Sequence, residues 1–335
     1  MTVGPRRVPA RRSRPSADVV VTAIVGPTAV GKSLVGVAMA GQPGLPPGEV
    51  VSADAMQLYR GMRVGTATLS DAEMCGVAHH LIGIWPVTRA ATVTEYRELA
   101  RGVIAEVSRR GHRALLVGGS GLYVSATLDD LEFPGTDPEV RRRWQHELDL
   151  HGPGWLHREL LARDAGAAAA IDPANGRRLV RALEVVEMTG SFRARLPDPI
   201  PEFLTARRVG LFSPWQDIDA RIRARVVQMW RDGLLDEVRC LVADGLTQDT
   251  NAGKAIGYAE VLAHLHGTAT ADEARAAIET NTRRLARRQM RWFRRDLRIT
   301  WWEVRPDADV AALAADITAG VGASPVPNPD GGPRR

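Results

Sequence analysis

The stretch IVGPTAVGKS, from Ile24 to Ser33, decides the fold of the first part of this chain. It places Gly26, Gly31, Lys32 and Ser33 in the spacing G-x-x-x-x-G-K-[ST], which is typical of phosphate-binding loops. An apolar run precedes the loop and a helical stretch follows it, so the loop is expected to join a buried parallel strand to a helix. The backbone N–H groups of the loop and the helix N-terminus are then suited to hold a diphosphate.

Side chains of the loop add to this site. Lys32 supplies a positive point charge, and the hydroxyl of Ser33 is a candidate ligand for Mg²⁺. The loop does not identify the molecule that carries the diphosphate, and a glycine-rich turn without a ligand is the alternative. The predicted diphosphate-binding residues are Gly26, Pro27, Thr28, Ala29, Val30, Gly31, Lys32 and Ser33.

Composition restricts the class of protein. A chain of 335 residues is long enough for about two domains. The net charge of +5 comes almost entirely from arginine, because Lys32 and Lys254 are the only lysines. Cys75 and Cys240 cannot form a disulfide framework, and no apolar run reaches the roughly 18 residues that span a membrane. The first residues lack the apolar core of a secretory signal. We therefore expect a cytoplasmic protein that does not enter a membrane.

Short apolar runs alternate with helical stretches along most of the chain, which predicts an α/β fold with a parallel sheet flanked by helices. No strand pattern is found between Asp137 and Gly190, where helices are expected at residues 140–150, 155–163 and 177–188. This segment is expected to be a small all-helical domain inserted into the core. The expected strands are Val19–Val25, Glu49–Asp54, Arg113–Gly121 and Arg207–Phe212.

These patterns divide the chain into four parts. A disordered basic arm is expected at residues 1–17, and an inserted helical domain at 131–204. The P-loop α/β core, which includes a basic helix near its end, is expected at 18–130 and 205–305. A C-terminal helix remnant and a disordered tail are expected at 306–335.

Candidate catalytic residues follow two of the expected strands. Asp54 ends the second run, and the carboxyl ends of parallel strands line one crevice, so Asp54 is expected to face the phosphate loop. It could act as a general base or bind Mg²⁺, and a helix N-cap without a chemical role is the alternative. The third run ends in LLVGGSGLY, where a nucleotide hydrolase usually has an acidic residue. Ser120 lies there instead, and a plain turn serine is its alternative.

The strongest local charge lies between Thr282 and Ile299. On a helix its arginines fall within about 140° of arc, with apolar residues on the opposite half. Only Asp296 is acidic in this stretch, so the face favours contact with a polyanion over a solvated helix surface. The eight arginines are Arg283, Arg284, Arg287, Arg288, Arg291, Arg294, Arg295 and Arg298, and a second basic group is Arg177, Arg178 and Arg181.

Several segments together resemble a known family, the tRNA dimethylallyltransferases. The most specific part is the string from Asp54 to Thr66, in order with the later AIGY and RRQ-x-x-WFR segments. Ala55 stands where the family usually has Ser, and Lys254 where it usually has Gln. The matching strings are GPTAVGKS (26–33), DAMQLYRGMRVGTA (54–67), HHLIGI (79–84), LLVGGSGLY (115–123), RRLVRALEV (177–185), GLLDEV (233–238), AIGYAE (255–260) and ARRQMRWFR (286–294).

The resemblance implies a substrate, a cofactor and a partner. The loop would hold dimethylallyl diphosphate with Mg²⁺, and the dimethylallyl group would pass to the exocyclic amine of the adenosine 3′ of the anticodon. Asp54 would take the proton of that amine, with Lys32 and Ser120 as further catalytic residues. The enzyme is expected to be a monomer. Contacts with the anticodon stem-loop of tRNA are expected at Asp54, Ala55, Met56, Gln57, Ser120, Arg177, Arg178, Leu179, Val180, Arg181, Arg284, Arg288 and Arg291.

Two rival interpretations remain open. A P-loop small-molecule kinase would explain the phosphate loop and the sheet, and it would have no need of the basic helix. A non-catalytic RNA-binding protein would bind tRNA through the arginines and would have no use for Asp54.

Overall fold

The computed structural model describes residues 20–193 and 201–324, which form two compact units. The larger unit comprises the chain up to Asp129 and again from Phe203 onward, and the smaller unit is Asp130–Glu202. The expected basic arm at 1–17 and the end of the expected C-terminal tail lie outside the described residues. Within this part of the chain, no helix is both long and apolar enough to cross a lipid bilayer.

The larger unit contains a six-stranded sheet with the order β3-β2-β4-β1-β5-β6, in which every neighbouring pair is parallel. This arrangement confirms the predicted α/β fold. The strand order places β1 between β4 and β5, so the loops after β1, β2 and β4 meet at the carboxyl edge of the sheet. The strands are β1 (Val20–Val25), β2 (Gly48–Ser52), β3 (His79–His80), β4 (Arg113–Gly118), β5 (Thr205–Phe212) and β6 (Ile299–Glu303).

Two strands were missed in the sequence, each for a physical reason. Strand β3 has two residues, which is too short for a residue pattern. Strand β6 begins at Ile299, inside the stretch that was expected to be one helix. That expectation was wrong, because helix α11 (Ala271–Phe293) ends earlier. The carboxylate of Asp296 accepts the backbone N–H of Arg298 at 3.1 Å, and such a local bond competes with a helical one.

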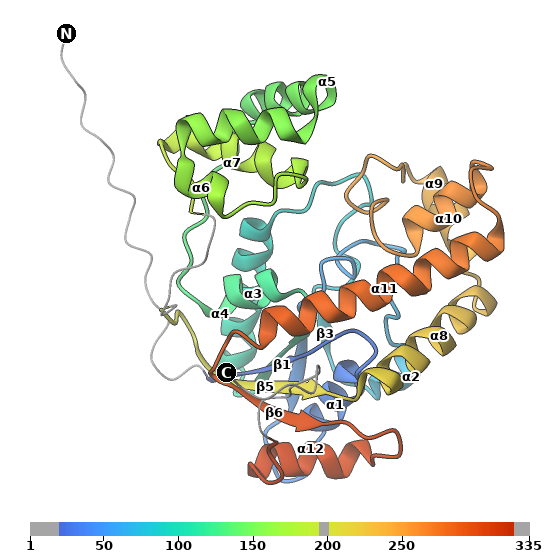
Figure 1. Ribbon diagram of the computed structural model, residues 1–335. Coiled ribbons are helices and arrows are strands. Elements are labelled where there is room, and N and C mark those ends of the chain that lie inside the picture. The colour runs from blue at the N-terminus through green and yellow to red at the C-terminus, as the bar shows by residue number, and fades with distance from the viewer. Residues whose placement is uncertain (1–19, 194–200, 325–335) are drawn as a thin grey trace. The chain divides into compact units, whose positions relative to one another are not determined.

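Helices cover both faces of the sheet (Figure 1). Helices α1 (Lys32–Ala40) and α12 (Val310–Ala319) pack together on one face, whereas α3 (Val93–Arg109), α4 (Gly121–Leu128) and α11 lie on the other. Thr270 and Glu273 form a capping box that starts α11. The remaining helices of this unit are α2 (Asp71–Met74), α8 (Trp215–Arg231), α9 (Leu234–Ala243) and α10 (Tyr258–Leu265).

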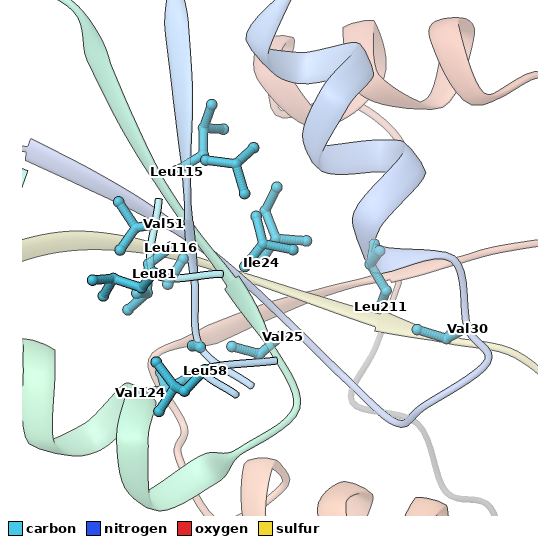
Figure 2. Packing of buried hydrophobic residues seen from close by; sticks show 14 of the residues in the cluster. Ile24, Val25, Val30, Val51, Leu58, Leu81, Leu115, Leu116, Val124 and Leu211 are labelled. Atoms are coloured by element: carbon cyan, nitrogen blue, oxygen red, sulfur yellow. The ribbon is translucent and has the colours of Figure 1, made fainter. Parts of the chain in front are cut away.

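The core of the larger unit lies between the sheet and these helices. Figure 2 shows the strand residue Val25 beside the loop residue Leu58 and the helix residue Val124, with the strand residues Ile24 and Leu115 of the same cluster farther away. All but Val124 of these five are fully buried, and Val124 is 6% exposed. A close-packed core of this kind holds the strand ends, and therefore the loops that follow them, in fixed positions.

The described residues of the smaller unit form three helices, α5 (Pro138–Arg163), α6 (Ala165–Ala169) and α7 (Gly176–Thr189). Asp137 caps α5 and Asn175 caps α7, and Gly190 ends α7 in the left-handed conformation. Gly152 has a non-helical backbone, with φ 75° and ψ 170°, and divides α5 near the point where two helices were expected. The unit has a hydrophobic core of its own, which includes Trp144.

Candidate active site

The phosphate loop is shaped by its unusual backbone. Gly26 has φ 148°, and a Cβ atom at that position would lie 2.4 Å from the carbonyl oxygen of Leu211. Ala29 has φ 65° and Gly31 has φ 103°, so the chain turns sharply back into α1. No side chain caps the start of α1. Its first N–H groups therefore point toward the carboxyl edge of the sheet as donors for an anion.

Lys32 lies in the first turn of α1, and no acidic side chain among the described residues forms an ion pair with it. Its Nζ atom donates to the carbonyl oxygen of Pro27 at 2.7 Å. Burial lowers the pKa of Lys32 to about 7; the charge of Asp54 opposes this shift, and the charge of Arg225 adds to it. An anion bound at the loop would raise this pKa again. Lys32 is therefore a desolvated cation placed where a phosphate group would sit.

Asp54 lies in the turn that follows β2. Its Oδ1 atom accepts the backbone N–H of Met56 at 2.9 Å, which is an Asx turn. No helix begins at this position, so the alternative of a helix N-cap does not apply. The next side chains are also anchored, because Ser52 donates its hydroxyl to Oε1 of Gln57 at 2.8 Å. The turn thus holds the Asp54 carboxylate in one place.

Ser120 connects the loops after β2 and β4. Its Oγ atom accepts the backbone N–H of Ala55 at 3.1 Å, and its own N–H donates to the carbonyl of Ala53 at 3.2 Å. Ser120 is absent from the residues that line the cavity described below. Ser120 therefore stabilises the Asp54 turn through these two hydrogen bonds.

A cavity of about 590 Å³ joins the phosphate loop to the Asp54 turn. One wall comes from the chain segment 63–70, and a further side comes from α8. Of the predicted site residues, those that line the cavity are Thr28, Ala29, Gly31, Lys32, Ser33, Asp54 and Gln57. The predicted residues Gly26, Pro27, Val30, Ala55 and Met56 support these loops without lining the cavity.

Two side chains that form hydrogen bonds with Thr28 of the phosphate loop were not predicted from the sequence. Arg225 of α8 lines the cavity, and its Nη1 atom donates to the hydroxyl of Thr28 at 3.3 Å. Burial lowers the pKa of Arg225 from its usual value. Gln289 of α11 accepts the backbone N–H of Thr28 at 2.8 Å. Arg225 lies in the segment RIRARV (221–226) and Gln289 in the RRQ-x-x-WFR segment, but their contacts with the loop depend on packing between segments that are distant in sequence.

The arginines near the end of the chain do not form one uniform basic face. Arg287 forms an ion pair with Asp219 at 2.9 Å, and Arg283 pairs with Glu279. Arg298 lies beyond the helix and binds Asp129 and Asp296. Of these partners, Asp219 and Asp129 come from distant segments, so the local sequence could not reveal them, whereas Glu279 and Asp296 are close in sequence. Among the described residues, no ion pair is formed by the exposed side chains of Arg284, Arg288 and Arg291.

The family model and the sequence relatives agree on the family. The model of the IPP transferase family matches residues 57–296. A tRNA dimethylallyltransferase of Kineococcus radiotolerans is 53% identical over 308 residues, which is 90% of this chain and 96% of the relative.

This chain belongs to the IPP transferase family.

Solved structures extend the likeness to the fold. A tRNA isopentenylpyrophosphate transferase from Bacillus halodurans is 37% identical and matches with a TM-score of 0.65, covering 90% of this chain and 96% of that one. A eukaryotic dimethylallyltransferase acting on tRNA has a TM-score of 0.74 at 22% identity, over 91% of this chain and 81% of that one. The second likeness concerns the fold alone. As in the named relatives, the chain is an enzyme of the tRNA dimethylallyltransferase family.

The family resemblance also suggested RNA contacts in the smaller unit, and the structure corrects part of that set. Leu179 and Val180 are 0% and 3% exposed, because they face the core between α5 and α7. Their side chains therefore cannot contact RNA in this arrangement. Arg181 binds Glu184 and the carbonyl of Pro134 within the unit. Arg177 and Arg178 are exposed on the surface of α7.

Proposed function

We propose that this enzyme transfers the dimethylallyl group from dimethylallyl diphosphate to the exocyclic amine of the adenosine 3′ of the anticodon in tRNA and releases diphosphate. The observation that carries the proposal is that the phosphate loop and Asp54 line one cavity. A leaving group held at the loop and Asp54 as proton acceptor would thus share one cavity. The sequence and structural likeness to tRNA dimethylallyltransferases supports this reaction over phosphoryl transfer.

The diphosphate end of the donor would lie at the phosphate loop. As the bond between the allylic carbon and the diphosphate oxygen breaks, negative charge grows on the leaving group. Lys32, Arg225 and the free N–H groups at the start of α1 are placed to stabilise that charge. Binding of the anion would also favour the protonated form of Lys32, whose pKa is about 7 without ligand.

The acceptor amine is a weak nucleophile, because its lone pair is delocalised into the adenine ring. A bond forms between this nitrogen and the allylic carbon, and the nitrogen loses one proton. The Asp54 carboxylate is the acid–base group placed for that proton. Ser120 holds the turn in which Asp54 lies, through the N–H of Ala55. The adenine would have to leave the stack of the anticodon loop to reach the cavity.

The cavity also fits Mg²⁺ as a cofactor. The hydroxyl of Ser33 and the carboxylate of Asp54 are hard oxygen donors that line it, and Mg²⁺ in proteins usually takes one or two such donors together with phosphate oxygens. We propose Ser33 as the residue that would hold the ion. Bound there, Mg²⁺ would withdraw charge from the leaving diphosphate.

Binding of tRNA would rest on two arginine groups. Arg284, Arg288 and Arg291 are exposed on α11, which also carries Gln289 to the phosphate loop. Arg177 and Arg178 of the smaller unit are exposed as well and would contact the anticodon stem-loop. We further propose that the enzyme works in the cytoplasm. We also propose that it is a monomer, which light scattering of the purified protein would test.

The direct test is incubation of the purified protein with radiolabelled dimethylallyl diphosphate and bulk tRNA. We expect label in the tRNA fraction, on adenosine, and release of unlabelled diphosphate. Label that stays with the donor would overturn the proposal. Thermal denaturation distinguishes the proposed prenyltransferase from a small-molecule kinase. Dimethylallyl diphosphate, and not ATP, is expected to raise the melting temperature.

A further inference from the structure

Three of the segments that match the family meet at one carboxylate, and apart from Asp54 and its turn they have no role in the chemistry above. Glu237 of α9 accepts the backbone N–H groups of three consecutive residues, Arg63, Val64 and Gly65, at 2.7 to 3.1 Å. It also accepts the hydroxyl of Tyr258, the first residue of α10, at 2.6 Å. The segments are DAMQLYRGMRVGTA, GLLDEV and AIGYAE.

The contacts around this carboxylate are tight. Tyr258 is fully buried, and burial raises the pKa of its phenol, with the charge of Glu237 adding to the shift. The phenol therefore stays protonated and remains a donor to Glu237. A Cβ atom on Gly65 would lie 2.5 Å from the Tyr258 ring, so only glycine allows this close approach. Four donors on one carboxylate fix the segment more firmly than isolated turn bonds do.

The segment held in this way is the start of a cavity wall. Arg63, Val64 and the residues from Thr66 to Ser70 line the cavity. Val64, Leu69 and Met229 supply apolar surface to the cavity that Lys32 and Arg225 also line. A five-carbon prenyl group attached to a diphosphate at the loop needs an apolar surface of this kind.

We infer that Glu237 is a positioning residue, which with Tyr258 holds the 63–70 wall against the prenyl part of the donor. The inference rests on the proposed function, since it presumes that the cavity takes a prenyl diphosphate. Glu237 does not line the cavity and acts through the backbone of the wall. Its loss is therefore expected to weaken recognition of the prenyl group while leaving the diphosphate site intact.

The test compares two ligands on wild type and Glu237→Gln by calorimetry. Inorganic pyrophosphate probes the phosphate loop alone, and dimethylallyl diphosphate probes the loop together with the wall. An amide in place of the carboxylate sets an N–H group against N–H donors, so the wall should shift. We expect the affinity for dimethylallyl diphosphate to fall about 10-fold or more, with pyrophosphate affinity unchanged within about twofold.

Matched variants separate positioning from general stability. Glu260→Gln removes a neighbouring carboxylate that binds the N–H of Gly257 and the amide of Asn281, away from the cavity, and should keep the ligand ratio of wild type. Tyr258→Phe removes a single bond to Glu237 and should reduce the ratio in the same direction by a smaller factor. Combined with Glu237→Gln, it should add little, because both act through one carboxylate.

The outcomes are distinguishable. An unchanged ligand ratio in both Glu237→Gln and Tyr258→Phe would overturn the inference, as would an equal loss of both ligands. A loss of tRNA affinity with unchanged donor affinity would also overturn it. Failure of the proposed function itself would be visible in wild type, which would then show no preference for dimethylallyl diphosphate over pyrophosphate.

Discussion

The charged groups at the two ends of the parallel sheet differ in whether they bind a partner of opposite charge. At the amino end, Glu49 of β2 is 6% exposed and accepts hydrogen bonds from His80, Arg110 and His112 at 2.6 to 2.9 Å. At the carboxyl end of the same sheet, Lys32 donates to a neutral carbonyl, and no ion pair forms with it among the described residues.

Within one sheet, the charged groups at the amino end therefore contribute to stability, and those at the carboxyl end are available for chemistry. Burial alone would raise the pKa of Glu49, but its hydrogen bonds with His80, Arg110 and His112 outweigh burial and lower the pKa to about 2. Burial shifts Lys32 in the direction that disfavours its charge. The paired end stabilises the folded chain, whereas the unpaired end gains its partner only when an anion binds. Sites that leave charges without partners usually lose stability in exchange for function.

The largest effect is expected at the unpaired end. Lys32→Ala should lower prenyl transfer about 10²- to 10³-fold, because it removes a preorganised cation from the leaving group. The melting temperature should not fall, since no carboxylate loses a partner. Steady-state kinetics and thermal denaturation provide the check. Lys254→Ala is the matched control, because it removes the only other lysine, whose Nζ donates to the carbonyl of Asp249. Turnover of Lys32→Ala near that of wild type would remove the phosphate loop from the mechanism.

The paired end should respond to acid. A carboxyl group with a lowered pKa stabilises the fold above its unfolded pKa of about 4.5, and that stability is lost as the pH falls toward about 2. For Glu49 the loss amounts to at most about 3 kcal/mol of unfolding free energy. Urea unfolding of wild type and Glu49→Gln between pH 6 and pH 3 measures it. The variant should start less stable and lose less on acidification, and parallel pH profiles would contradict the assignment.

Arginines with and without an acidic partner also occur together in α11, and their replacement is expected to have a smaller effect, on tRNA binding. Arg284, Arg288 and Arg291 have no acidic partner among the described residues, whereas Arg287 pairs with Asp219. Replacing the three unpaired arginines by Gln should lower the salt slope of tRNA binding by up to about three units, one for each charge. Arg287→Gln should lower it less than Arg288→Gln does. Filter binding across a salt titration is the measurement, and equal slopes for the triple variant and wild type would place the RNA footprint elsewhere.

Much of the site could be predicted because its parts are local in sequence. The loop of Gly26 to Ser33 lies between a strand and a helix, and Asp54 follows the next strand, so strand topology alone brings them together. Ser120 was found by the same logic, although its bond to Ala55 shows a supporting position that residue type could not reveal.

The parts that could not be predicted depend on contacts between distant segments. Arg225 and Gln289 reach Thr28 from positions 197 and 261 residues away in the chain. Asp219, the partner of Arg287, and Asp129, one of the two partners of Arg298, also come from elsewhere, so an apparently uniform basic face is in fact divided. Leu179 and Val180 belong to the segment RRLVRALEV, which matches the family, but in this chain their side chains lie in the hydrophobic core of the smaller unit.

The central claim is that charges at the carboxyl edge carry the chemistry and those at the amino edge hold the fold. The most direct test measures kcat and melting temperature for Asp54→Asn and Glu49→Gln side by side. We expect Asp54→Asn to lose about 10²- to 10⁴-fold in kcat with its melting temperature unchanged. Glu49→Gln should lose about 1–3 kcal/mol of stability and keep its kcat at temperatures where it is folded. A loss of less than tenfold in Asp54→Asn, or an equal loss of kcat in folded Glu49→Gln, would contradict the claim.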